Sequence, residues 1–272
     1  MRAALLTEYR KLVTTRLWWV LLLTMAGYMA FLGLVIAFPF VQAGALGGGG
    51  GGGGAGPMEM SDVDRALSIY TLAPALGYVF PVVVGALSVT GEFRHMTITP
   101  TLLAEPRRSV VLGAKVIASL PVGLLFGLVG TASTVAGGAL VLAVSGEGTA
   151  LGNPEVLRAL GLSVLALAVW TMVGVGFGAV LPNQVAAIVV ILAFTQLVEP
   201  MVRLALGAIE GAAAVAKFLP GAAGEAITGS SFYQAMGLAE LLPWWQGLLV
   251  LVGYGLVLTV IGRLTTFRRD IT

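Results

Sequence analysis

Residues 17–38 read LWWVLLLTMAGYMAFLGLVIAF, an apolar run that contains no charged residue. A helix that crosses a bilayer needs about 20 consecutive, largely apolar residues. This run has that length and lacks a small-residue cleavage site after a short core, so it predicts a retained membrane helix and not a removed signal peptide. Further runs of spanning length follow at residues 69–90, 110–144, 156–181, 184–202 and 244–267. The sequence therefore predicts six transmembrane helices.

The composition agrees with a chain that lies in the membrane. Hydrophobic residues make up 58% of the 272 residues and charged residues 10%, whereas soluble domains have roughly 45–50% and about 25%. The apolar runs leave no room for a separate soluble catalytic domain of the usual ~100–150 residues. The absence of cysteine excludes thiolate metal sites and a cysteine nucleophile. We therefore predict an all-α integral membrane protein with one transmembrane domain over residues 1–272.

The distribution of positive charge predicts the orientation of these helices. With six crossings, 11 of the 15 lysines and arginines fall on one side of the membrane. They are Arg2, Arg10, Lys11, Arg16, Arg94, Arg107, Arg108, Lys115, Arg263, Arg268 and Arg269. The positive-inside rule makes that side cytoplasmic. We therefore expect a multi-pass protein of the plasma membrane with both termini in the cytoplasm.

The first 16 residues predict a short helix that lies on the cytoplasmic surface of the membrane. Its apolar face is expected to consist of Leu5, Tyr9, Leu12 and Val13. Glu8, Lys11 and Thr15 are expected to point away from that face. The alternative interpretation of residues 1–16 is a frayed extension of the first membrane helix.

Two segments on the opposite, extracellular side also have distinct compositions. Residues 39–68 contain an uninterrupted glycine run at 47–54, which cannot bury side chains and predicts a flexible loop. Residues 204–219 are apolar but short, carry Glu210 and Lys217, and precede Pro220-Gly221. We therefore predict that residues 204–243 contain a re-entrant or interfacial segment and not a seventh crossing.

Motifs for nucleotide, metal or catalytic chemistry are missing from the sequence. A phosphate-binding P-loop needs Gly-Lys-Ser/Thr after its glycines, whereas the glycine run here ends in Ala55-Gly56-Pro57. The only histidine, His95, has no metal-ligand set near it in the sequence. We therefore expect no catalytic site, no metal, no cofactor bound by this chain and no nucleic-acid partner.

Three residues within the predicted helices are candidates for a substrate path or an outer gate. Glu199 and Arg203 are one helical turn apart, so they either form a local i,i+4 pair or line a cavity. Trp170 lies too deep for an interfacial belt and faces a substrate path, a partner subunit or simply lipid or core. Few other charges lie deep in the helices, and Lys115 is expected to snorkel to the interface.

The segment between the second and third predicted helices, residues 91–108, reads GEFRHMTITPTLLAEPRR. Thr99 is expected to cap and Pro100 to open a short helix, Leu102-Leu103 to give it an apolar side, and Pro106 to end it. One interpretation is a rigid knob that projects from the membrane on the cytoplasmic side. The other is an ordinary tight loop with a basic membrane anchor.

This segment, together with two others, resembles the permeases of the type-2 class of ABC exporters. The similar motifs are Glu92-Phe93-Arg94, Thr97, Thr101-Leu102-Leu103, Pro106-Arg107-Arg108 and Ala114-Lys115. Val198-Glu199-Pro200 followed by Phe218-Leu219-Pro220-Gly221-Ala222-Ala223 is also similar, as is Glu8-Tyr9-Arg10-Lys11 before the first span. The order of these motifs along nearly the whole chain agrees with the family pattern.

The resemblance implies a six-helix permease that forms a dimer with a second copy or a related permease. It places a coupling helix within residues 91–108, an interfacial helix at the N-terminus and re-entrant helices within residues 204–243. Two separate ABC ATPase subunits would bind ATP and Mg and contact the coupling segment. The contact residues implied are Glu92, Phe93, Arg94, Thr101, Leu102, Leu103, Arg107 and Arg108.

Two other classes of function compete with an ATP-driven export permease. A secondary transporter or channel, working without an ATPase, usually needs charged residues deep in its helices, and the sequence offers few. An intramembrane enzyme needs a membrane-embedded Ser/His pair, an Asp pair or a His-Glu-x-x-His helix, and none is present. The sequence therefore favours a transport subunit that is not itself an enzyme.

The predicted orientation can be tested with single cysteines, since the natural chain has none. A cysteine at Gly50 should react with a membrane-impermeant thiol reagent added outside intact cells, because residue 50 lies in the predicted extracellular loop. A cysteine at Thr101 should react only after the membrane is opened. Labelling of both from outside would contradict the predicted topology.

Overall fold

The computed structural model describes residues 2–47, 61–207, 209, 213–230, 234 and 240–268. The chain is 85% helical, and no strand occurs among these residues. Six helical spans are long and apolar enough to cross a membrane, which confirms the predicted number. They are Leu17–Gln42, Asp62–Arg94, Arg108–Val144, Pro154–Val180, Gln184–Leu206 and Trp244–Thr265. The chain is therefore a multi-pass membrane protein.

Several of these spans are divided into shorter helical elements. The elements before the third span are α1 (Arg2–Thr14), α2 (Leu17–Gly47), α3 (Asp62–Tyr70), the π-helix η1 (Ala73–Gly77), α4 (Val79–Arg94) and α5 (Ile98–Ala104). The next are α6 (Arg108–Val144), α7 (Pro154–Val180), α8 (Gln184–Ala193), the π-helix η2 (Phe194–Val198) and α9 (Glu199–Gly207). The last are α10 (Ala213–Ala216), α11 (Pro220–Thr228) and α13 (Trp244–Thr265).

Helix α7 lies at the centre of the bundle, where it contacts α4, α6 and α13, while α2 packs on the far side of α6. The span that contains α4 is 72% buried and that of α7 is 67% buried, whereas the spans of α2, α8–α9 and α13 are each 22% buried. The three peripheral spans expose mostly aliphatic and aromatic side chains. This arrangement suits a lipid environment, because apolar side chains on the outer helices can face hydrocarbon.

Glycines allow α7 to approach its neighbours closely. A Cβ atom at Gly174 would lie 2.0 Å from the carbonyl oxygen of Val82 on α4, and one at Gly178 would lie 2.5 Å from that of Ala86. On α6, a Cβ at Gly123 would lie 2.8 Å from the Cα of Ala168. Such backbone contacts replace the hydrophobic driving force that is missing between helices in lipid.

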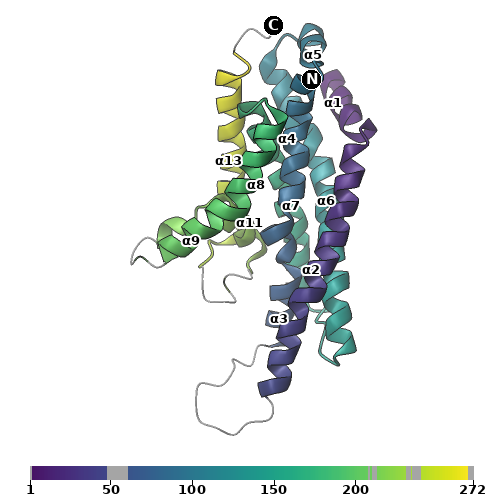
Figure 1. Ribbon diagram of the computed structural model, residues 1–272, viewed down its shortest axis with the longest axis vertical. Helices are drawn as coiled ribbons and strands as arrows, with labels where there is room; N and C mark the ends of the chain where they lie inside the picture. The colour runs from purple at the N-terminus through teal and green to yellow at the C-terminus, as the bar shows by residue number, and fades with distance from the viewer. Residues whose placement is uncertain are drawn as a thin grey trace.

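Helix α1, helix α5 and the C-terminal end of α13 lie at the same end of the bundle, the upper end in Figure 1, which we call the termini end. The C-terminal end of α2 lies at the opposite end, toward the bottom of Figure 1. Figure 1 also shows α9 projecting sideways from the bundle.

The loop predicted at residues 39–68 is shorter than expected. Helix α2 continues to Gly47 and α3 begins at Asp62. Ser61 caps α3 by accepting a hydrogen bond from the backbone N–H of Asp64, and two aspartates in the first turn match the positive end of the helix dipole. The glycines at 48–54 lie outside the described residues.

The region predicted to contain a re-entrant or interfacial segment, residues 204–243, is described in part. Residues 204–206 belong to the fifth span, which is longer than predicted, and Glu210 lies outside the described residues. A short buried helix within the region is α11, all nine residues of which are buried. It packs against α7, α13 and η1.

Candidate functional site

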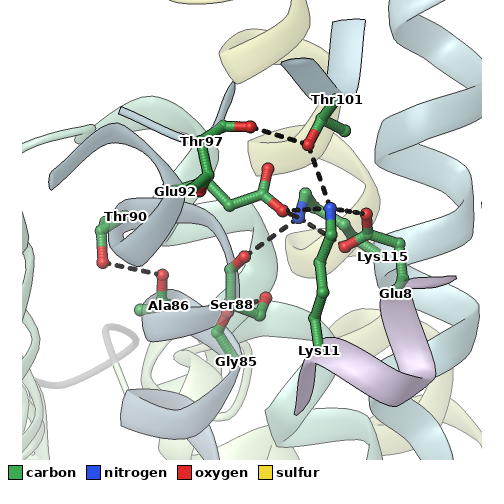
Figure 2. A network of polar contacts seen from close by, with 10 residues as sticks. All are labelled: Glu8, Lys11, Gly85, Ala86, Ser88, Thr90, Glu92, Thr97, Thr101 and Lys115. Atoms are coloured by element: carbon green, nitrogen blue, oxygen red, sulfur yellow. Dashed lines mark hydrogen bonds and ion pairs between the residues drawn. The ribbon is translucent and has the colours of Figure 1, made fainter. Parts of the chain in front are cut away.

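A network of charged side chains joins three helices at the termini end. Glu8 and Lys11 come from α1, Glu92 from the last turn of α4 and Lys115 from α6 (Figure 2). Lys115 Nζ lies 2.6 Å from Glu8 Oε2 and 2.8 Å from Glu92 Oε1, and it donates to the Ser88 carbonyl at 3.0 Å. The charges of two glutamates and two lysines therefore alternate and cancel.

Lys11 connects this network to α5. Its Nζ lies 2.7 Å from Glu8 Oε1 and 2.7 Å from Glu92 Oε1, and it donates to Thr101 Oγ1 at 3.0 Å. Thr101 in turn donates to the Thr97 carbonyl at 2.9 Å. Burial lowers the pKa of Lys11, but the hydrogen bonds and negative charges of Glu8 and Glu92 outweigh it, so that the pKa is raised. Lys11 is therefore charged at neutral pH and holds α5 against the bundle.

Three of these four side chains are nearly inaccessible to solvent, since Lys115 is 1%, Glu8 5% and Glu92 7% exposed, whereas the side chain of Lys11 is 35% exposed. Charges buried this deeply are tolerated when they are paired and hydrogen-bonded. Loss of one partner leaves a buried charge without compensation, which typically costs about 3–5 kcal/mol. We name this set, Glu8, Lys11, Glu92 and Lys115, the termini-end network.

One prediction about these residues was wrong. Lys115 does not snorkel to the interface, because Glu8 and Glu92 neutralise it inside the bundle. In α1, Glu8 lies on the side opposite the apolar face, as predicted: Glu8 is buried against the protein, whereas Tyr9 is 45% and Val13 40% exposed. An apolar face that looks outward suits a helix in contact with lipid.

Helix α5 has an inner and an outer side. On the inner side, Ile98 is buried in a cluster with Val89, Leu112 and Phe267, and Leu102 packs against that cluster. On the outer side, Leu103 is 78% exposed. The preceding turn adds Met96, which is 66% exposed and has a positive φ of 58°. The start of α5 also differs from expectation, because Thr97 and not Thr99 is its N-cap residue and it makes no side-chain capping bond.

The other residues predicted for a coupling contact do not form one surface. Phe93 packs edge-on against Phe267, with ring centroids 5.6 Å apart. Arg94 donates to Gln184 Oε1 at 3.2 Å, which links the end of α4 to the start of α8. Arg107 Nε pairs with Glu105 Oε1 at 2.9 Å, and Arg108 donates to the carbonyl of Phe267. Glu92, Phe93 and Arg108 thus fix the segment internally, while Leu103 and Met96 lie on its surface.

A second buried cluster joins α9 to α11. Arg203 Nη2 lies 2.8 Å from Glu199 Oε1, which confirms the predicted local pair. Its Nη1 lies 2.7 Å from Glu225 Oε1. Glu199 Oε1 also accepts hydrogen bonds from the backbone N–H groups of Gly221 at 2.6 Å and Ala222 at 3.2 Å, where a negative charge is favoured by the dipole of α11. We name Glu199, Arg203 and Glu225 the α9–α11 cluster.

Sequence reasoning missed Glu225 and the depth of these charges. The three side chains are 1%, 8% and 2% exposed, so the expectation of few deep charges was wrong. The signal that could have revealed Glu225 is local: it is the only charged residue in 218–229, among glycines and alanines that allow close packing. Arg203 pairs with both carboxylates of the cluster.

Trp170 lies beside this cluster and not against lipid. Its ring stacks on Tyr78 with centroids 4.3 Å apart, and it is 1% exposed. A Cβ at Gly224 would lie 2.6 Å from Trp170 Nε1, while one at Gly221, a turn earlier on α11, would lie 2.6 Å from Glu199 Oε1. Trp170 Nε1 and Glu199 Oε2 have no hydrogen-bond partner among the described residues. Trp170 therefore belongs to the core between α7, η1 and α11.

No family model matches this sequence, and no curated protein is significantly similar to it. Within the described part of the chain, no group of three histidines, aspartates or glutamates is arranged to hold a metal ion. Function is therefore inferred from the two charged clusters and from the surface of α5.

The termini-end network predicts a charge-specific loss of stability. Lys115→Met leaves two buried carboxylates facing one lysine, so the protein should lose about 3–5 kcal/mol of stability. This loss should be visible as a lower midpoint of thermal unfolding in detergent. The double variant Glu8→Gln/Lys115→Met restores neutrality and should recover much of the loss.

Glu105→Gln serves as the control, because it removes an ion pair with the exposed Arg107 and should change the midpoint little. A Lys115→Met protein as stable as the wild type, or a double variant less stable than the single one, would show that charge balance is not what the network contributes.

Proposed function

We propose that the chain is the membrane-spanning permease subunit of an ATP-driven ABC exporter. In this proposal, two copies, or one copy and a related permease, enclose the substrate path. Two separate ATPase subunits bind ATP and Mg and drive the path open. The termini end faces the cytoplasm of a cell whose plasma membrane holds the protein.

The observation that supports this proposal most is the construction of α5. A subunit without a nucleotide motif must receive work through contact with a partner, and a contact that transmits force has to be stiff. On its inner side, helix α5 is held by Ile98, which is buried in an apolar cluster, and by Thr101, which accepts a hydrogen bond from Lys11 of the termini-end network. On the outer side, Leu103 of α5 and Met96 of the preceding turn are largely exposed although they are apolar. A rigid element with an uncovered apolar tip is suited to a docking contact.

The proposal assigns finer roles to the other elements. Helix α1 is the interfacial helix, and α5 with its flanking residues 91–108 is the coupling segment. Helices α9 to α11 are the re-entrant region on the outer side. Since side chains of α1, α4 and α6 meet Thr101 of α5 in one polar network, a push on α5 is transmitted to α1 and to the second and third spans together.

The α9–α11 cluster favours a second candidate function, a secondary transporter or channel that needs no ATPase. Ionisable residues within membrane spans commonly mark ion or proton pathways. One carboxylate oxygen of the cluster, Glu199 Oε2, has no hydrogen-bond partner among the described residues. It is closed, however, by the backbone of α11, whose N–H groups are bound to Glu199. We therefore place the ATP-driven exporter first.

The test is retention of ATPase by the affinity-tagged chain, purified from its native membranes. Met96→Ser/Leu103→Ser should reduce the co-purified ATP hydrolysis about tenfold or more, because burying one leucine side chain contributes roughly 1.5–3 kcal/mol. Insertion should be unaffected, since neither residue belongs to a membrane span. Val144→Ser, which changes an equally exposed residue at the opposite end of α6, is the control.

Hydrolysis that is retained at the wild-type level in the Met96→Ser/Leu103→Ser protein would exclude α5 as the coupling contact. A wild-type protein that carries no ATPase, yet transports when only an ion gradient is applied, would favour the second candidate.

A further inference from the structure

A cavity of about 610 Å³ lies at the termini end, between the start of α6 and the end of α13. Four arginines line it, namely Arg107, Arg108, Arg263 and Arg268, with Leu264 and Phe267 as its apolar wall. The cavity adjoins the proposed coupling segment through Arg107 and Arg108, but it does not include the exposed apolar residues Leu103 and Met96 proposed for the coupling contact. Its volume falls in the usual range of ligand sites, roughly 300–1,000 Å³.

The charge in the cavity is strongly positive. Arg107 is paired with Glu105, and Arg108 is oriented by the carbonyl of Phe267. Arg263 and Arg268 are both exposed and form no ion pair with any described residue. Guanidinium groups bind phosphate through two parallel hydrogen bonds. The cavity is therefore suited to a phosphate-bearing anion.

The position of the cavity along the membrane spans indicates which kind of molecule carries that phosphate. Arg108 is the first residue of the third span, and Arg263 lies in the last turn of the sixth. Next to Arg263, Leu264 is 57% and Ile261 41% exposed, so an apolar surface begins where the arginines end. This is the border between hydrocarbon and headgroups, where basic pockets between membrane helices bind anionic lipid headgroups.

We propose that this cavity binds the phosphate headgroup of an anionic phospholipid, with its acyl chains along the exposed apolar face of α13. Arg263 and Arg268 hold the phosphate, and Arg108 completes the site from α6. The inference goes beyond the proposed function. Lipid binding at this cavity requires only that the chain spans a bilayer, so it can be tested whether or not an ATPase binds the chain.

The experiment measures lipid binding by native mass spectrometry on the purified full-length chain. Phosphatidylglycerol and phosphatidylcholine are titrated separately. The wild type should bind phosphatidylglycerol more tightly than phosphatidylcholine, and Arg263→Gln/Arg268→Gln should weaken the phosphatidylglycerol affinity about tenfold or more. The affinity for phosphatidylcholine, which carries no net charge, should not change.

The matched control is Arg10→Gln/Arg16→Gln, which removes the same charge from exposed arginines at the same end of the molecule. It should leave the phosphatidylglycerol affinity unchanged. An equal loss in both double variants would overturn the site, because it would indicate a diffuse surface attraction. If Arg263→Gln/Arg268→Gln proves unfolded, Arg268→Gln alone carries the test, since Arg268 follows the end of α13.

Two further results would overturn the lipid as ligand. Displacement of phosphatidylglycerol by low millimolar inorganic phosphate would make the cavity a site for free phosphate. Loss of co-purified ATPase in Arg263→Gln/Arg268→Gln, without any preference of the wild type for phosphatidylglycerol, would make it a protein docking surface.

Discussion

The cancellation of charge inside the bundle is the constraint on which the rest of this structure depends. A chain with so few charges nevertheless buries Glu8, Glu92 and Lys115 at one end of the bundle, where the half-buried Lys11 pairs with both glutamates. An unpaired charge at this depth is costly, so each of these side chains is held in an ion pair. The ion pairs fix α1, α4 and α6 relative to one another, and the hydrogen bond from Lys11 to Thr101 attaches α5.

In the α9–α11 cluster the buried charges are also paired, but backbone N–H groups take part as well as side chains. Arg203 pairs with both of its carboxylates, and the N-terminus of α11 supplies further stabilisation through the backbone N–H groups of Gly221 and Ala222. The short helix α11 is therefore anchored in the bundle by Glu199.

The six spans and the Glu199–Arg203 pair could be predicted from the sequence. The length of an apolar run and an i,i+4 spacing are both properties of a single continuous helix. The partners of Lys115 were not predictable in this way, since Glu8 and Glu92 are brought to it only by tertiary packing. The same holds for Glu225. Helical periodicity separated the apolar face of α1 from Glu8 correctly, but it could not show that Glu8 meets Lys115 of α6.

The central claim is that the termini-end network holds α5 in place, and amide hydrogen exchange over residues 98–104 tests it most directly. Lys11→Met removes the link to Thr101, so exchange in α5 should become about tenfold faster or more than in the wild type. Arg107→Gln, which removes only an exposed ion pair, should leave the exchange of α5 as it is. Exchange in α5 that is equally slow in the wild type and in Lys11→Met would contradict the claim.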